Sequence, residues 1–458
     1  MRVIICGAGQ VGWQLARYLS KEGNDVTVVD NQAALVARAT DTLDVGGLTG
    51  FASHPDVLAA AGAEDAEMII AATHSDEVNM VTCQIAHSVF RVPRKIARLR
   101  AQTYLDVIYS DLYQRDHLPS DVVISPEKEV ADAALRQLSA PSSFEVETFL
   151  DGQMTMLGLL IEEDCPVINT PLRQLTDLFS TLSSFVAGVR RDRHLFVPKP
   201  EDQIYAGDQI YVFTRTEDIN RTLEVFGKSA KKQERVLIIG GGSIGLRVAS
   251  ELESRTDRVR CRVIERDREQ AEIAADLLEK TVVLHGDGLD IEILQEANIA
   301  QTDSVLCLTD DDKTNLLASA RAKSSGAKMA LALINDTSLS SMMETMDVDA
   351  FLNPRATTVS SILRHIRHGR VRAVYAVGDA EAEVMELQTL SNSQIAGRPL
   401  EDLDFPDSAR IVAVKKGNDV LRPTAEMRLE EGDLAVVFAM ADAVRTVEAM
   451  FQVSVDFF

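Results

Sequence analysis

The feature that most constrains this chain is an internal repeat. Residues 3–12, with the sequence VIICGAGQVG, return as residues 236–245, VLIIGGGSIG, so that Gly240 stands 233 positions after Gly7. Later blocks follow in the same order at an offset of 236: Gly50 answers to Gly286, and Thr73, Asp76 and Asn79 answer to Thr309, Asp312 and Asn315. Because a repeat dictates the architecture of the chain that contains it, the fold must be one that can be built twice in tandem.

Each half also contains a smaller second unit. Residues 171–172 and 207–213 match residues 399–400 and 432–438. Ahead of each small unit, Ser125-Pro126 and Asn353-Pro354 combine an N-cap residue with a first-turn proline, which predicts two matched helix starts. We therefore predict four domains, at residues 1–124, 125–226, 233–352 and 353–458.

The larger units have the pattern of an α/β fold. Short apolar runs at residues 26–29, 68–71, 261–264 and 304–308 alternate with amphipathic stretches of helix length. This alternation predicts a Rossmann-like, doubly wound parallel sheet with helices on both faces. In the smaller units, runs such as residues 411–414 and 434–438 are separated by Gly-Asn, Pro or Glu-Gly turns, which predicts a small α+β domain rich in strands.

Charge and cysteine content exclude several classes of partner. The net charge of −23 argues against nucleic acid and anionic lipid as partners, because both would be repelled. A protein with a basic surface stays open as a partner. The five cysteines are scattered, so we expect buried reduced thiols in a cytoplasmic protein. We also expect no signal peptide and no membrane span, since no apolar run reaches about 18 residues. Membrane association would then depend on another protein.

The segment between the two halves differs in charge from the rest. Residues 227–233, GKSAKKQ, form a basic stretch in an acidic chain. It is typical of a solvated linker, and a contact with an anion or a partner protein stays open.

The repeated glycines predict a nucleotide site. Gly7, Gly9 and Gly12 follow an apolar strand and open a helix, the arrangement that lets a pyrophosphate approach a helix N-terminus. Asp30 ends the next strand, where its carboxylate would accept hydrogen bonds from a ribose diol and repel a 2′-phosphate. This favours NAD or an adenine nucleotide over NADP.

The second half repeats the pattern with Gly240, Gly242 and Gly245, and with Glu265 in the acidic position. For both loops the alternative is that the glycines serve helix packing alone. Arg98 could hold a phosphate or be a surface arginine. Aligning residues 95–97 with 328–330 gives Leu331 as its counterpart. If Arg98 binds phosphate, the second site should bind dinucleotide more weakly or prefer another ligand.

The sequence contains no motif that supports an enzymatic function. Residues 241–245 satisfy the G-x-S-x-G pattern of hydrolases, but Ser243 corresponds to Gln10, so the fold needs no hydroxyl there. Residues 227–229 lack the earlier glycine of a P-loop. His74 has no evident acid partner. We predict no catalytic residue.

Metal binding is also weakly supported. The run at residues 310–312 consists of three aspartates, which could attract a divalent cation or cap the following helix. His365 and His368 would share a helical face as a metal pair or a surface pair. We predict no metal site.

Taken together, the sequence resembles the regulator-of-potassium-conductance family, called RCK or KTN. The resemblance covers nearly the whole chain and rests on residues 1–12, on residues 53–58 with 61–63, on residues 73–80, and on the duplication of a large and a small domain.

The resemblance implies the cytoplasmic, peripheral regulator of a bacterial Trk potassium uptake system, bound to the inner face of an integral membrane potassium-translocating subunit. It implies NAD or NADH as ligand, with ATP or ADP possible at the second site, and a homo-oligomeric ring, expected to be tetrameric. The alternatives are an NAD-dependent oxidoreductase and a nucleotide-binding regulator of another cation transport system.

Motif and resemblance together give the candidate ligand-binding residues. In the first half these are Gly7, Ala8, Gly9, Gln10, Val11, Gly12, Asp30, Thr73, His74 and Arg98. In the second half they are Gly240, Gly241, Gly242, Ser243, Ile244, Glu265, Thr309 and, less directly, Asp310.

Overall fold

The computed structural model describes the chain except for residues 22, 114–116, 179–183, 229–234, 256–258, 340–341, 343–344, 367–370, 379–380 and 453–458. The described chain divides into two compact units. One contains residues 1–130 and 353–365, and the other contains residues 131–352 and 366–458. Each unit is described by itself below.

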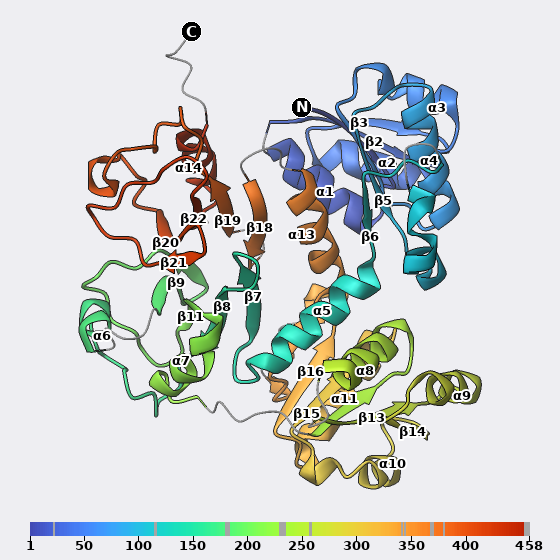
Figure 1. The fold of residues 1–458 in the computed structure, drawn as a ribbon. Coiled ribbons are helices and arrows are strands. Elements are labelled where there is room, and N and C mark those ends of the chain that lie inside the picture. The colour runs from blue at the N-terminus through green and yellow to red at the C-terminus, as the bar shows by residue number, and fades with distance from the viewer. Residues whose placement is uncertain are drawn as a thin grey trace. The chain divides into compact units, whose positions relative to one another are not determined.

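The first unit contains a six-stranded parallel sheet in the order β3-β2-β1-β4-β5-β6 (Figure 1). Its strands are β1 (Arg2–Cys6), β2 (Asp25–Asp30), β3 (Gly46–Thr49), β4 (Met68–Ala71), β5 (Arg94–Arg98) and β6 (Val122–Ile124). Its helices are α1 (Gln10–Lys21), α2 (Ala33–Thr42), α3 (Pro55–Ala60) and α4 (Asp76–Ser88), with short 3-10 turns η1 (Ala63–Asp65), η2 (Gln102–Leu105) and η3 (Val107–Tyr113).

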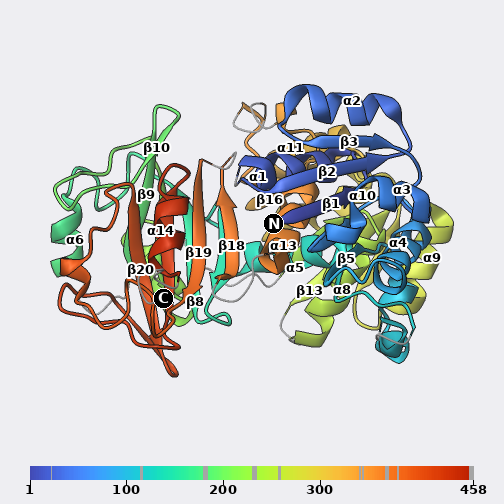
Figure 2. The ribbon, with the colours of Figure 1, turned by 90° about the horizontal axis from the view of Figure 1, so that it is seen from above.

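Alternation along the strands sends side chains to two covered faces. Ile4 of β1 packs in a core with Leu58 of α3 and Ala86 of α4, whereas Ile5 points to the face where α1 passes closely at Gly12. Helices therefore cover both faces of the sheet (Figure 2). The chain changes face between β3 and β4, so β1 and β4 flank a topological switch point, where open α/β sheets bind ligands.

The second unit contains an equivalent parallel sheet, in the order β14-β13-β12-β15-β16-β17. Its strands are β12 (Arg235–Ile239), β13 (Arg260–Glu265), β14 (Val282–His285), β15 (Ser304–Cys307), β16 (Met329–Leu333) and β17 (Ala350–Leu352). The helices are α8 (Ser243–Arg255), α9 (Arg268–Leu277), α10 (Ile291–Glu296) and α11 (Asp312–Ser324), with 3-10 turns η5 (Ile299–Gln301) and η6 (Thr337–Leu339).

The two smaller domains are antiparallel sheets with the same connectivity, β10-β9-β11-β8-β7 and β18-β19-β22-β20-β21. The first has β7 (Glu145–Phe149), β8 (Met154–Leu160), α6 (Leu172–Leu178), β9 (Phe185–Arg191), β10 (His194–Phe196), β11 (Gln209–Arg215), η4 (Thr216–Asp218) and α7 (Ile219–Val225). The second has β18 (Val371–Val377), β19 (Ala382–Gln388), η7 (Leu400–Asp402), β20 (Ala409–Lys416), β21 (Asp419–Leu421), β22 (Leu434–Met440) and α14 (Val444–Met450).

These two small domains share one hydrophobic core. Phe149 and Phe213 of the first pack in the same cluster as Val384 and Phe438 of the second, and the rings of Phe213 and Phe438 meet edge to face at 6.5 Å. A buried hydrogen bond also joins the domains, because the amide of Leu150 donates to the Glu386 carboxylate at 2.8 Å. Burial of matched apolar faces thus makes the pair one body.

The matched helix starts are confirmed. Helix α5 (Pro126–Ser139) follows Ser125, whose hydroxyl accepts from the Lys128 amide. Helix α13 (Pro354–Ile366) follows Asn353, whose side-chain Oδ1 accepts from the Arg355 and Ala356 amides. Residues 353–365 of α13 belong to the first unit, and within it Arg364 forms an ion pair with Glu129 at 2.9 Å. A helix from the second half of the chain therefore completes the first unit.

The predicted fold class is confirmed, with parallel sheets in the large domains and strand-rich α+β structure in the small ones. All five cysteines are buried and free, and burial raises the pKa of Cys83 and of Cys307 to about 12. No helix in the described ranges is long and apolar enough to cross a membrane. Of the predicted basic linker, Lys228 pairs with Glu162 at 2.6 Å, and residues 229–233 lie outside the described residues.

Candidate nucleotide-binding sites

The first glycine of each loop is required by backbone geometry. Gly7 directly follows β1 at φ +109°, and Gly240 directly follows β12 at φ +110°, a region that L side chains rarely adopt. A Cβ at Gly7 would lie 2.8 Å from the carbonyl oxygen of Ala72, and one at Gly240 would lie 2.9 Å from the amide nitrogen of Thr309. The loops therefore turn directly against the ends of β4 and β15.

The other two glycines of each loop have different surroundings. A Cβ at Gly12 would lie 1.7 Å from the carbonyl oxygen of Gly7, and one at Gly245 would lie 2.0 Å from that of Gly240, so both permit close helix packing. A Cβ at Gly9 or Gly242 would meet nothing within 4 Å. Packing alone thus explains the third glycine but not the second, which leaves the space that an approaching phosphate needs.

Both loops are held by the acid that ends the second strand. The amide of Ala8 donates to Asp30 Oδ2 at 2.7 Å, while the amide of Gln32 donates to Oδ1 at 2.9 Å. In the second domain the amide of Gly241 donates to Glu265 Oε2 at 2.6 Å, and the backbone amide of Asp267 donates to Oε1 at 2.8 Å. Each carboxylate therefore stands beside its glycine loop, where a ribose could compete for it.

The longer acid of the second domain, Glu265, has Gly241 beside it, and the loop has one further contact. A Cβ at Gly241 would lie 3.3 Å from Glu265 Oε2, tighter than usual, whereas the first domain has Ala8 beside the shorter aspartate. Gln270 of α9 also donates its side-chain amide to the Gly241 carbonyl at 2.7 Å. The second loop is consequently tied to its surroundings by more side-chain hydrogen bonds.

Thr73 and Thr309 are oriented by a buried asparagine. Asn79 accepts from the Thr73 amide at 2.9 Å and from its hydroxyl at 2.6 Å, and donates to the Arg98 carbonyl at 2.8 Å. Asn315 makes the same set of bonds to Thr309 and to the carbonyl of Leu333. Since each threonine hydroxyl donates its proton to asparagine, it can only accept from a ligand.

Arg98 is a buried cation at the end of β5. Its side chain is 8% exposed, and within the described chain its Nε has no hydrogen-bond partner. Burial lowers the pKa of Arg98 to about 10, and Arg100 lowers it further, while Glu127 and Asp76 oppose the shift. A desolvated guanidinium gains most from an added anion, so the surface-arginine alternative is wrong for this residue.

Comparison with known proteins gives the family. The TrkA-N domain matches residues 3–126 and 236–354, and the TrkA-C domain matches residues 156–227 and 384–452. The chain belongs to the TrkA family. Proteins named Trk system potassium uptake protein TrkA from Azorhizobium caulinodans and Halomonas elongata are 45% and 35% identical to it, over the full length of both chains in each case.

A solved structure supports the TrkA fold. The structure described as the GsuK channel bound to NAD aligns with a TM-score of 0.59 at 18% identity, covering 98% of this chain and 78% of that one. At this identity the similarity concerns the fold alone.

The structure corrects one residue assignment between the two TrkA-N domains. Strand pairing matches Ala71 with Ala97 in the first sheet and Cys307 with Ala332 in the second, so the counterpart of Arg98 is Leu333, not Leu331. The bonds from Asn79 and Asn315 give the same register. The sequence alignment was wrong because it matched Lys95 to Lys328, two residues out of register; a leucine still replaces the arginine.

The remaining predicted residues are placed as follows. Gln10 and Ser243 are exposed at the first positions of α1 and α8, Val11 is buried in α1, and Ile244 is partly buried in α8. His74 and Asp310 are exposed in the loops after β4 and β15. These positions bring all candidates of each half to the carboxyl edge of one sheet.

The aspartate run has a structural role. Asp311 is the N-cap of α11 and accepts from the Thr314 amide, as the capping alternative predicted, and Asp312 accepts from the amides of Asn335 and Asp336. His365 is exposed near the end of α13, and His368 lies outside the described residues.

Sequence reasoning missed the residues that hold these sites together. Asn79 and Asn315 were noticed as repeated positions but were not assigned to the sites, although conservation between copies of a polar residue inside an apolar helix face was the available signal. Gln270 carried no signal, because its counterpart is Leu35.

Proposed function

We propose that the chain is a regulatory subunit without turnover, which binds NAD or NADH in its first TrkA-N domain and controls potassium uptake through a Trk-type membrane subunit. The observation that carries this proposal is the match, over the whole length and in both domain types, to relatives named Trk system potassium uptake protein TrkA. The alternative of a regulator for another cation transport system lacks a comparable observation.

The first site suits a dinucleotide. Gly9 leaves open space at the loop, and the first amides of α1 lack partners within the helix. The Asp30 carboxylate, which accepts from the Ala8 amide, stands where a ribose diol would donate to it. Arg98 supplies a buried positive charge for a phosphate. NAD is bound by the channel GsuK, which has the same fold.

The second site suits a nucleotide that needs less help from a cation. Gly242 leaves the same space, and Glu265 takes the ribose position, but Leu333 replaces the arginine. We assign this site to ATP, ADP or a more weakly bound NAD, with Thr309 and Asp310 at its margin. The inequality of the two sites is what a sensor of several nucleotides requires.

The bound nucleotide acts as a signal in this proposal. NAD can carry a hydride, but a dehydrogenase also needs an acid or base at the nicotinamide, and the candidates at the first site are poor. His74 is exposed, and the hydroxyl proton of Thr73 is committed to Asn79. An NAD-dependent oxidoreductase is therefore the disfavoured alternative.

The proposed location is the cytoplasm, at the inner face of the membrane, with the subunits arranged as a homo-oligomeric ring of four. We keep the predicted domain boundaries at residues 1–124, 125–226, 233–352 and 353–458. Nucleic acid is not a partner in this proposal because the chain carries a net charge of −23. A ligand would shift the ring between two arrangements by its difference in affinity for them, typically about 1–3 kcal/mol.

Calorimetric titration tests the sites. NAD, NADH, ATP and ADP are titrated into the wild-type chain, Asp30→Ala and Glu265→Ala. We expect Asp30→Ala to weaken NAD and NADH by at least about tenfold, the value of a charge-assisted hydrogen bond, and Glu265→Ala to weaken the adenine nucleotides. Unchanged affinities in both variants would show that the ligands bind elsewhere.

Transport tests the function. The chain is added to proteoliposomes that contain a Trk-type membrane subunit, and potassium flux is measured with each nucleotide. We expect flux to depend on the chain and on the nucleotide, and Asp30→Ala to lose the response to NADH. Steady oxidation of NADH by the purified chain with simple metabolites, without an effect on flux, would overturn the proposal in favour of an enzyme.

A further inference from the structure

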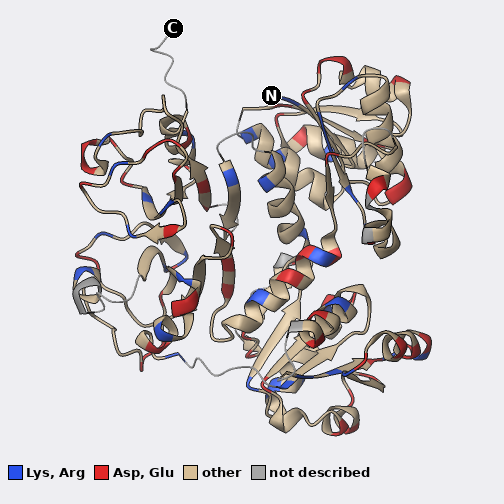
Figure 3. Cartoon of the chain, in the orientation of Figure 1, with Lys and Arg blue, Asp and Glu red and all other residues tan. Residues whose placement is uncertain are grey.

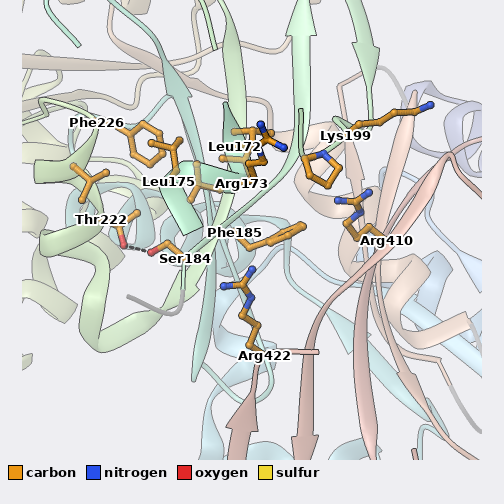
Figure 4. A pocket seen from close by; sticks show the side chains of 14 residues that line it. Leu172, Arg173, Leu175, Ser184, Phe185, Lys199, Thr222, Phe226, Arg410 and Arg422 are labelled. Atoms are coloured by element: carbon orange, nitrogen blue, oxygen red, sulfur yellow. Dashed lines mark hydrogen bonds between the residues drawn. The ribbon is translucent and has the colours of Figure 1, made fainter. Parts of the chain in front are cut away.

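A cavity of about 250 Å³ lies where the two small domains meet inside the second unit. Its wall combines residues of α6, β9, β11 and α7 from the first small domain with Arg410 and Arg422 from the second (Figure 4). It is separate from both glycine loops, which lie in the TrkA-N domains. The function proposed above makes no use of it.

The charge of the lining is opposite to that of the chain. Arg173, Lys199, Arg410 and Arg422 line the cavity, and its described lining contains no aspartate or glutamate. The whole chain has 70 acidic against 47 basic residues, and acidic side chains occur in each of the four domains (Figure 3). A lining of four cations in such a chain creates a local positive field that attracts anions.

Arg410 is the least exposed of the four cations. Its guanidinium stacks over the ring of Phe185 at 5.7 Å, a contact between the two small domains. Burial lowers the pKa of Arg410, and only the nearby Asp407 opposes the shift. No ion pair to Arg410 occurs among the described residues, so this desolvated cation would gain from an anion in the cavity.

The rest of the wall is apolar. Leu172, Leu175 and Phe226 form one side and Phe185 faces Arg410 (Figure 4). Inorganic anions would gain nothing from this surface, whereas an apolar body would be removed from water. We propose that this cavity binds an amphipathic organic anion, with its carboxylate or phosphate at Arg410 and Arg422 and its apolar part against Phe185 and Leu175.

The basic lining is not a consequence of the fold, because the other copy lacks it. The strand registers make Phe185 the counterpart of Arg410, and the repeat makes Glu401 the counterpart of Arg173. The apolar positions correspond, because Leu400 and Leu403 pack against a core in the second domain as Leu172 and Leu175 do in the first. The two copies therefore differ at these positions in charge.

Isothermal titration of the full chain with three probes tests the proposal. Phenyl phosphate and decanoate each join an anion to an apolar body, aromatic in one and aliphatic in the other, and inorganic phosphate lacks the body. We expect at least one of the first two to bind with Kd below about 1 mM, and inorganic phosphate to bind at least about tenfold more weakly. The stronger of the two organic probes is then used for the variants.

Matched variants locate the binding. Arg410→Gln and Arg422→Gln should each weaken the organic probe by about tenfold or more, and Arg410→Lys should restore part of the affinity. Arg193→Gln removes the same charge from an exposed turn between β9 and β10 outside the lining and should change nothing. Circular dichroism checks that each variant is folded. If Arg410→Gln does not fold, the Arg422→Gln variant still tests the site, because Arg422 is exposed.

The outcomes separate this inference from the proposed function. Binding that survives both arginine variants, or that inorganic phosphate matches, overturns the proposed site. Loss of probe binding in Asp30→Ala or Glu265→Ala also overturns it, because the probe would then occupy a glycine loop. Failure of the NAD titration leaves this result untouched.

Discussion

The two TrkA-N domains agree in backbone and differ where a ligand would lie. Both have the same strand order, the same first glycine at positive φ, and the same buried asparagine in the helix that follows the switch-point strand. The first combines Ala8, Asp30 and Arg98, and the second combines Gly241, Glu265 and Leu333. The duplication has thus kept the glycines, threonines and asparagines that shape the loops, and it has changed three of the positions proposed to contact a nucleotide.

The largest effects should fall on the third glycine of each loop. In Gly12→Ala the added Cβ would lie 1.7 Å from the carbonyl oxygen of Gly7, and in Gly245→Ala it would lie 2.0 Å from that of Gly240. We expect a loss of about 4 kcal/mol or more in unfolding free energy, since neither backbone can move away cheaply. Urea denaturation measures it.

The second glycines are the matched control. Gly9→Ala and Gly242→Ala meet nothing within 4 Å, so they should leave the unfolding free energy nearly unchanged and weaken nucleotide binding instead. If all four variants lost stability equally, the loops would have a packing role alone.

The next effect concerns the small domains and depends on pH. Burial raises the pKa of Glu383 to about 8, with a further contribution from Glu448, whereas its counterpart Thr155 does not titrate. The folded state then holds a proton that the unfolded state releases above about pH 4.5, so stability should fall by about 3 kcal/mol between pH 5 and 8. Glu383→Gln should flatten this part of the stability profile.

Thr155→Val provides the control for that measurement, because it changes a buried polar residue at the equivalent position without removing a titrating group. It should keep the wild-type slope. A Glu383→Gln profile parallel to wild type would mean that Glu383 is ionised throughout this range.

Arg98→Leu gives the first site the character of the second. We expect NAD to bind about 10 to 100 times more weakly, the loss typical of a hydrogen bond to a charged group. Trp13, the single tryptophan, lies on α1 with Arg17 and Arg38 over its ring, so its fluorescence reports on this domain. Arg94→Leu removes a charge from the opposite end of β5 and should leave the titration unchanged. Equal losses in both variants would point to a general effect of charge.

The smallest effect should come from Gly241→Ala. The added methyl would press on the Glu265 carboxylate, which can shift, and we expect a cost of about 1 kcal/mol in unfolding free energy. Ala8→Gly, the reverse change in the first loop, should cost less than that. Denaturation of both variants decides whether the glycine accommodates the longer acid.

The fold could be predicted because its determinants are local. Apolar runs at residues 68–71 and 304–308 became β4 and β15 within one residue, and the Ser-Pro and Asn-Pro pairs opened α5 and α13. The glycine loops and their acids were equally visible, since motif and strand lie within one βαβ unit.

What could not be predicted depends on register and on distant contacts. The sequence alignment gave Leu331 instead of Leu333 as the counterpart of Arg98, because it paired Lys95 with Lys328, two residues out of register. Only strand pairing corrects this false match. The burial of Arg98 and the cavity at Arg410 both arise where elements far apart in sequence converge, and no local pattern encodes this.

The contact between Arg410 and Phe185 bears on how such a chain can evolve. In a symmetric dimer of identical chains a residue on the axis meets its own copy, so this position would pair arginine with arginine or phenylalanine with phenylalanine. Fusion of two copies into one chain removes that demand for self-complementarity, and each side can be selected separately. The interface between the small domains could therefore acquire an arginine that faces a phenylalanine while both sheets kept the same topology.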